Sequence, residues 1–135
     1  MKITADTNVL LRVVLNDDEA QQQVAIDTLE SAEAVAVSVQ ALCEFVRVLD
    51  RGYKTAYADI AAAIRSLLEM RNVVVNRPAV EAGLRVLDAG GDFADGIIAF
   101  DGNWLGGETF VSFDRKAVAI LARRGQQARL LSPHA

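Results

Sequence analysis

The stretch ITADTNVLL, residues 3–11, opens the chain with a short apolar strand that runs directly into a helix. Asp6 stands at the junction and is followed by Thr7 and Asn8. An unpaired carboxylate is costly where a strand enters a buried helix, so Asp6 needs a partner or a ligand. The same strand-to-helix step is also the first unit of an alternating α/β pattern.

Short apolar runs alternate with longer helical patterns along the rest of the chain. Continuous runs such as Ala34–Ser38 are typical of parallel strands that are buried on both faces. We therefore predict an α/β fold, a three-layer α/β/α sandwich around a central, mostly parallel five-stranded sheet. The expected strands are Lys2–Ala5, Ala34–Ser38, Val73–Asn76, Thr109–Ser112 and Arg129–Leu131, and the expected helices are Asn8–Leu15, Asp18–Ser31, Val39–Leu49, Thr55–Met70, Pro78–Leu87, Phe93–Phe100 and Arg115–Arg123.

Length and composition narrow the class of protein. The chain has 135 residues, which is a typical length for one domain, so we expect a single domain over residues 1–135. No apolar run reaches the length of a membrane span and no signal segment precedes the first strand, so we expect a cytoplasmic protein without a membrane partner. The single cysteine, Cys43, cannot form an internal disulfide, which suits a reducing compartment.

The charged residues restrict the chemistry. A net charge of −4 speaks against a dedicated nucleic-acid binder unless bound cations neutralise some of the acids. The only histidine, His134, lies in the C-terminal tail. A catalytic triad, histidine acid–base catalysis and a zinc site are therefore poorly supported, and any catalysis falls to carboxylates.

Four acids fall where an α/β sheet binds ligands, beyond the carboxyl ends of its strands. Asp6 and Asp114 follow the first and fourth expected strands, Glu44 is in the second turn after the AVAVS strand, and Asp95 is in the first turns of a helix. Carboxylates gathered at one edge repel one another unless cations bind them. Oxygen ligands alone favour Mg²⁺ or Mn²⁺ and support two-metal phosphoryl chemistry. We call these four residues the acidic quartet.

Each acid also has a purely structural reading. Asp92 and Asp114 can be N-caps of the helices that follow them, where the helix dipole favours a negative charge. Glu44 can pair with Arg47 or Arg51 one turn further along its helix. For any one residue these readings stay open, and it is the joint arrangement that favours a metal site.

Four segments in this order and spacing resemble the PIN-domain nucleases: ITADTNVLLR, ALCEFVRVL, GDFADGIIAF and FVSFDRKA. The resemblance covers essentially the whole chain and is closest to the VapC toxins of bacterial type II toxin–antitoxin (VapBC) systems. It implies that the acidic quartet is catalytic and holds Mg²⁺ or Mn²⁺. It further implies a metal-dependent endoribonuclease, a hydrolase that cleaves RNA, with a VapB-like antitoxin as partner.

Three polar residues match positions beside the family's acids. We expect Asn8 to hold Asp6 by a hydrogen bond. Ser112 occupies a position where the family more commonly has threonine, and serine retains the hydroxyl group. Asp92 matches a position where the family frequently has an acid beside its metal ligands. It can equally be only the N-cap of the helix that follows it.

Residues outside the acids give weaker expectations. Gly96 and the run Asp101-Gly102-Asn103 predict that the helix starting at Phe93 ends early or bends. We expect Trp104 to pack in the core or an interface rather than to stack on a base. Basic side chains near the acidic edge can hold RNA phosphates or be ordinary solvated charges. The candidates are Arg12, Arg47 and Lys116.

The helix Asn8–Leu15 is apolar nearly all round, with only Arg12 interrupting the run. A surface helix needs one apolar stripe, so we predict a homodimer and a groove that accepts an antitoxin tail or amphipathic helix, in a higher hetero-oligomer. The alternative is a helix wedged wholly inside the monomer.

Other functions remain to be weighed. The segment DTNVL is similar to the opening of haloacid-dehalogenase phosphatases, but Asn8 replaces their second aspartate. The remaining alternatives are a PIN nuclease that processes RNA without an antitoxin, and a non-catalytic, metal-free interaction module on the same fold.

Overall fold

The computed structural model describes residues 1–133 and separates into two compact units, with the division between Asn76 and Arg77. His134 lies outside the described residues. No helix within residues 1–133 is long and apolar enough to cross a membrane. That the chain acts as a single domain stays a prediction.

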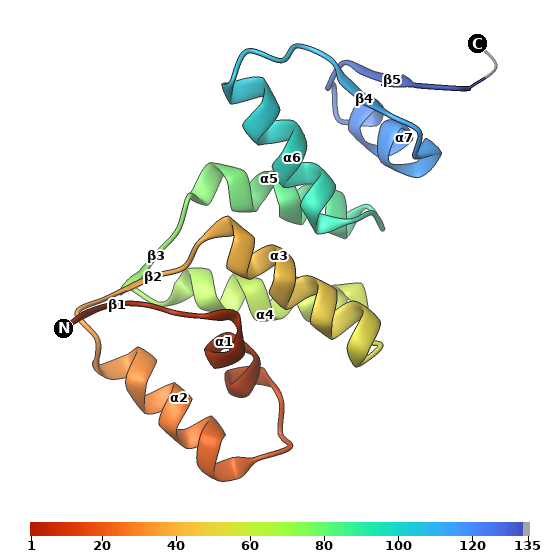
Figure 1. The fold of residues 1–135 in the computed structure, drawn as a ribbon. Coiled ribbons are helices and arrows are strands. Elements are labelled where there is room, and N and C mark those ends of the chain that lie inside the picture. Colours follow the sequence, from red (N-terminus) through yellow and green to blue (C-terminus); the bar gives the residue numbers. More distant parts are fainter. Residues whose placement is uncertain (134–135) are drawn as a thin grey trace. The chain divides into compact units, whose positions relative to one another are not determined.

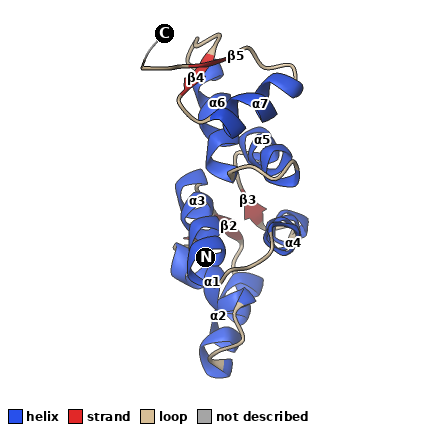
Figure 2. Ribbon diagram, turned by 90° about the vertical axis from the view of Figure 1, so that its right-hand side faces the viewer, coloured by secondary structure: helices blue, strands red, loops and turns tan. Residues whose placement is uncertain are grey.

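The first unit contains a parallel three-stranded sheet in the order β1-β2-β3, with Val35 opposite both Ile3 and Val73. Figure 2 shows helices α3 and α4 on either side of these strands. The strands are β1 (Lys2–Thr4), β2 (Ala34–Ala36) and β3 (Val73–Val74). The helices are α1 (Thr7–Val14), α2 (Glu19–Ser31), α3 (Val39–Arg47), the π-helical turn η1 (Val48–Gly52) and α4 (Tyr57–Glu69).

Local chemistry explains how the α3–α4 hairpin forms. The Ser38 side chain accepts a hydrogen bond from the Ala41 N–H and so caps α3 as expected. One face of α3 and η1 is buried, and its apolar residues are Leu42, Phe45, Val46 and Leu49. Lys54 takes a left-handed backbone conformation between η1 and α4, which reverses the chain.

The second unit packs three helices with a parallel pair of strands (Figure 1). Its elements are α5 (Arg77–Asp88), α6 (Phe93–Trp104), β4 (Phe110–Ser112), α7 (Arg115–Arg123) and β5 (Ala128–Leu130). The buried side chains of Val86, Ala99, Ile120 and Leu121 form its core, and Phe110 and Ala128 pack against them.

The α/β class and the three-layer arrangement of the sequence prediction are confirmed, and every expected strand and helix is present. Hydrogen bonds join β1, β2 and β3 within the first unit and β4 and β5 within the second. Apolar runs indicate where strands lie, but which strands pair depends on contacts distant in the sequence, which the runs do not encode.

The prediction that the helix starting at Phe93 ends early is wrong, because α6 continues to Trp104. Gly96 is needed for packing rather than for a break. A Cβ at Gly96 would overlap the backbone oxygen of Ala82 and lie 2.8 Å from the Cα of Gly83. Just beyond the end of α6, Gly106 has a positive φ of 102° and donates its N–H to the Asn103 carbonyl.

Candidate functional site

Two acids of the acidic quartet meet in the first unit through Thr7. The Asp6 side chain accepts a hydrogen bond from the Thr7 N–H at 2.9 Å, at the start of α1. The Thr7 hydroxyl lies 3.3 Å from Oε2 of Glu44 and 3.1 Å from the Ala41 carbonyl oxygen. Thr7 is only 4% exposed, whereas both carboxylates are exposed to solvent. A buried hydroxyl therefore ties the end of β1 to α3.

Thr7 takes the role that the sequence assigned to Asn8. The Asn8 side chain is exposed and forms no hydrogen bond with any residue in 1–133. The sequence signal that could have identified Thr7 is a small hydroxyl residue directly after a capping acid, at the first position of a buried helix. The predicted pairing of Glu44 with Arg47 or Arg51 is also not seen among the described residues.

The other two acids of the quartet lie in the second unit, at the starts of neighbouring helices. Asp114 caps α7 by accepting from the Ala117 N–H at 3.1 Å, and Asp95 is half-buried in the first turn of α6. Burial is the largest cause that raises the pKa of Asp95, and the negative charges of Asp92 and Asp114 raise this pKa further. The charges of Asp92 and Asp114 therefore both act on Asp95.

Two polar residues support the acids of the second unit. Ser112 ends β4 and its hydroxyl accepts the Asp114 N–H at 2.9 Å, so it sets the backbone where the acid begins α7. Asp92 caps α6 by accepting from the Ala94 N–H at 3.0 Å. The cap reading of Asp92 is confirmed, and the same carboxylate raises the pKa of Asp95. A supporting role for Asp92 at a metal site stays a prediction.

The donor chemistry in each unit suits a hard cation. Asp6 and Glu44 supply only carboxylate oxygens in the first unit, as Asp95 and Asp114 do in the second, and oxygen donors fit Mg²⁺ or Mn²⁺. Neither unit, over residues 1–133, brings three or more His, Cys, Asp or Glu side chains close enough to hold a metal ion by themselves.

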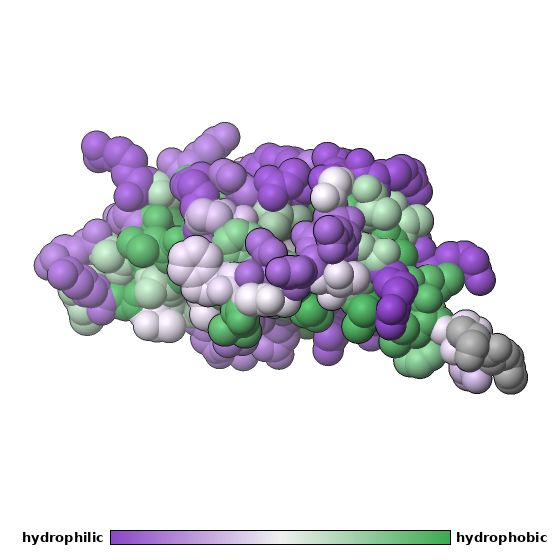
Figure 3. All heavy atoms as spheres, turned by 90° about the horizontal axis from the view of Figure 1, so that it is seen from above, coloured by the Kyte–Doolittle hydropathy of each residue, from purple (hydrophilic) through white to green (hydrophobic). Residues whose placement is uncertain are grey.

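The candidate RNA-binding residues have different surroundings. Arg12 donates to Asp17 at 2.8 Å and forms an ion pair with it, so much of its charge is already matched. Arg47 at the end of α3 and Lys116 in the first turn of α7 are exposed. Trp104 is 82% exposed, so it does not pack in the core, and the prediction that it packs in an interface stays a prediction. Figure 3 shows other hydrophobic side chains reaching the surface between hydrophilic ones.

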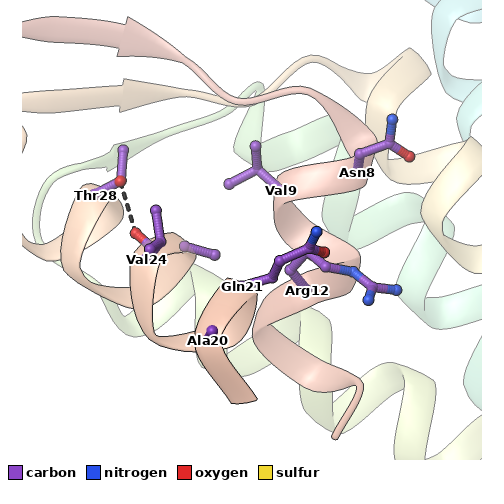
Figure 4. A pocket seen from close by; sticks show the side chains of 8 residues that line it. Asn8, Val9, Arg12, Ala20, Gln21, Val24 and Thr28 are labelled. Atoms are coloured by element: carbon purple, nitrogen blue, oxygen red, sulfur yellow. Dashed lines mark hydrogen bonds between the residues drawn. The ribbon is translucent and has the colours of Figure 1, made fainter. Parts of the chain in front are cut away.

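A largely apolar pocket of about 400 Å³ lies between α1 and α2 in the first unit. Figure 4 shows Asn8, Val9 and Arg12 of α1 on one side and Val24 and Thr28 of α2 on the other. Val24 is 66% exposed. In α1 itself Leu10 and Leu11 are buried, and the remaining apolar side chains are half-buried. Apolar surface thus stays accessible between these two helices.

Comparison with protein-family profiles matches residues 3–123 to the PIN domain. No curated protein matches the chain significantly. PIN domains are generally metal-dependent nucleases, which are hydrolases that act on nucleic acid. The match spans nearly the whole chain and includes every acid described above. The chain belongs to the PIN-domain family.

Proposed function

We propose that the chain is a Mg²⁺-dependent endoribonuclease that acts in the cytoplasm as the toxin of a type II toxin–antitoxin pair. The observation that supports this proposal best is the grouping of carboxylates in each unit. Asp6 and Glu44 are joined through Thr7, and Asp95 is influenced by the charges of Asp92 and Asp114. A PIN-domain chain that holds its acids in this way is equipped to bind a divalent cation against RNA.

In this proposal the acidic quartet as a whole holds Mg²⁺ or Mn²⁺. When bound, the metal supplies an activated water and stabilises the leaving oxygen of a phosphodiester. Thr7 orients Glu44 through its hydroxyl, and Ser112 fixes the backbone of Asp114. Exposed cations such as Arg47 and Lys116 orient RNA phosphates without reading sequence.

The nuclease proposal is tested by neutralising each acid of the quartet in turn, as Asp6→Asn, Glu44→Gln, Asp95→Asn and Asp114→Asn. Each variant should stay folded and lose Mg²⁺-dependent RNA cleavage by roughly 100-fold or more, because even changes outside the direct ligands cost about 10- to 100-fold. Glu81→Gln, an exposed acid on α5 outside the quartet, is the matched control. Cleavage that persists in a chelator, or full turnover by any quartet variant, would refute the metal mechanism and favour the non-catalytic alternative.

The chemistry of the product tests the same mechanism independently. Water that attacks the phosphorus in line should leave 5′-phosphate and 3′-hydroxyl ends. Mass spectrometry of the cleaved RNA distinguishes these ends from a 2′,3′-cyclic phosphate. A cyclic product would mean that the RNA's own 2′-hydroxyl is the nucleophile, and the two-metal mechanism would be wrong.

The partner part of the proposal is a homodimer that binds a VapB-like antitoxin in a higher hetero-oligomer. Its support is the apolar pocket between α1 and α2, whose accessible surface suits an extended tail or an amphipathic helix. A small upstream gene for a DNA-binding protein would supply the partner to test. A chain that cleaves RNA equally well in that partner's presence would instead be an RNA-processing nuclease without an antitoxin.

A further inference from the structure

A second pocket, of about 280 Å³, lies among α5, α6 and α7 in the second unit. Its lining combines two arginines, Arg85 and Arg124, with the carboxamides of Asn103 and Gln126 and an apolar wall that includes Phe100. None of these residues belongs to the acidic quartet or supports it. The pocket therefore has chemistry that the proposed cleavage site does not use.

The two arginines carry charge that the protein does not match. Arg124 donates from Nη2 to the backbone oxygen of Arg85 at 3.3 Å. No ion pair of either guanidinium is seen within residues 1–133. A guanidinium has five N–H donors in a fixed fork that suits phosphate oxygens. Two such groups facing one pocket favour an anion between them.

The rest of the lining suits a nucleobase. Phe100 is half-buried and offers a ring on which a base can stack. The carboxamides of Asn103 and Gln126 hydrogen-bond no other residue within 1–133, so their donors and acceptors remain available for the edge of a base. Phosphate, flat base and polar base edge together describe one nucleotide, and about 280 Å³ is a volume of that order.

The part of the pocket that α7 lines is separated from Asp114 along that helix. Asp114 caps the start of α7, whereas Leu121 and Arg124 line the pocket at the other end. At 1.5 Å of rise per residue, these positions are separated by about 10–15 Å. A nucleotide in the pocket is therefore not the one whose phosphodiester meets Asp114, but a neighbour on the same strand can be.

We propose that this pocket binds one unstacked nucleotide of single-stranded RNA, a short distance along the strand from the cleaved bond. The assignment of the ligand as RNA rests on the proposed ribonuclease function. Stacking and contacts to the base edge require a base out of the double helix, which single-stranded RNA offers. The pocket thereby contributes to the choice of substrate and to its affinity.

The test measures binding of a labelled, unstructured RNA to the full chain in EDTA, where metal-dependent cleavage does not occur. The double variant Arg85→Gln/Arg124→Gln should bind roughly tenfold more weakly or worse. In a plot of the logarithm of affinity against the logarithm of salt concentration, the slope for this variant should be shallower by about 0.7, because one phosphate contact is lost. The matched control is Arg123→Gln/Arg129→Gln, which removes the same charge from exposed positions of the same unit outside the pocket. Equal losses in both variants would overturn the proposal.

Two further arms identify the source of the phosphate. A nucleoside monophosphate and inorganic phosphate are titrated against the same proteins. Phe100→Leu should weaken RNA and the mononucleotide but leave inorganic phosphate unaffected, because only the first two carry a base. If the double arginine variant binds the mononucleotide more weakly but binds RNA as the unaltered chain does, the pocket binds a free nucleotide. The assignment of the ligand as RNA is then wrong.

Failure of this inference can be told apart from failure of the proposed function. The same RNA is incubated with the unaltered chain in Mg²⁺. If the unaltered chain cleaves this RNA but the Arg85 and Arg124 substitutions do not change RNA affinity, only the proposal for the pocket is wrong. A chain that binds through the pocket and does not cleave overturns the proposed activity and supports the pocket.

Discussion

At the scale of single residues, one buried residue, Thr7, connects two acids that are far apart in the sequence: its N–H donates to Asp6 and its hydroxyl to Glu44. Thr7 and Glu44 are 37 positions apart, yet their oxygens lie 3.3 Å from each other. Local patterns could identify Asp6 as unusual, but they could not show which residue orients Glu44, because its partner, Thr7, comes from another helix. The sequence therefore predicts the supporting contacts poorly, and the role of the acids as metal ligands stays a prediction.

Replacing Thr7 by valine keeps its shape and removes the donor. Thr7→Val should lower the free energy of unfolding by about 1 kcal/mol, the usual net contribution of a hydrogen bond. It should also raise the Mg²⁺ concentration needed for cleavage by about 10- to 100-fold, because Glu44 loses its orienting contact. Urea unfolding and Mg²⁺ titrations of activity measure the two effects. Thr7→Ser retains the hydroxyl and is the control, and a serine variant as impaired as valine would contradict this role.

Asp95 predicts a pH dependence of stability. Burial, and then the charges of Asp92 and Asp114, raise its pKa in the folded protein above the ordinary value of 3.8. As the pH rises through the raised pKa, the folded protein loses a proton that the unfolded chain has already released, so stability falls. Asp95→Asn should therefore raise the melting temperature of the metal-free protein at pH 7, and the gain should vanish below pH 3.8. Calorimetry across pH, with Glu81→Gln as control, measures this, and a gain that persists in acid would contradict it.

At the scale of elements, helix starts were easier to predict than helix ends. Ser38, Asp92 and Asp114 each cap a helix through their own side chains, and such caps are local signals. The end of α6 was misjudged because a glycine lowers helix propensity in any context, whereas the value of Gly96 comes from α5, a different segment. Tertiary packing overrode propensity here.

Two glycines of α6 make this argument testable within one helix. Gly96→Ala places a Cβ against backbone of α5 that cannot give way, and should destabilise the protein by about 1–3 kcal/mol. Gly102 has no atom within 4 Å of a built Cβ, so Gly102→Ala should stabilise it by about 0.5–1 kcal/mol through helix propensity. Denaturant unfolding of the two variants should give shifts of opposite sign. Stabilisation by both substitutions would mean that propensity alone governs α6.

At the scale of the whole molecule, the apolar runs predicted the α/β class and all five strands, but not which strands pair within each unit. Strand pairing is settled by long-range contacts rather than by the period of a run. The same limit applies to surfaces. The all-round apolar character of α1 indicated a partner, but only the packing of α1 on α2 locates the accessible apolar surface, at Val24 and the pocket beside it.

That surface gives a prediction about assembly. Val24→Glu puts a charge on the rim of the α1–α2 pocket, where burial against an apolar partner would leave it unpaired. The variant should fold and cleave RNA normally, because Val24 lies outside the acidic quartet. It should lose antitoxin binding by a hundredfold or more, of the order of the 2–5 kcal/mol that an unpaired interface charge costs. Ala62→Glu adds the same charge at an exposed site on α4, outside the pocket, and should bind as the unaltered chain does. Co-purification with the upstream partner and light scattering read out the complex. If the Val24→Glu variant still co-purifies with that partner and is still inhibited by it, the antitoxin binds elsewhere on the molecule.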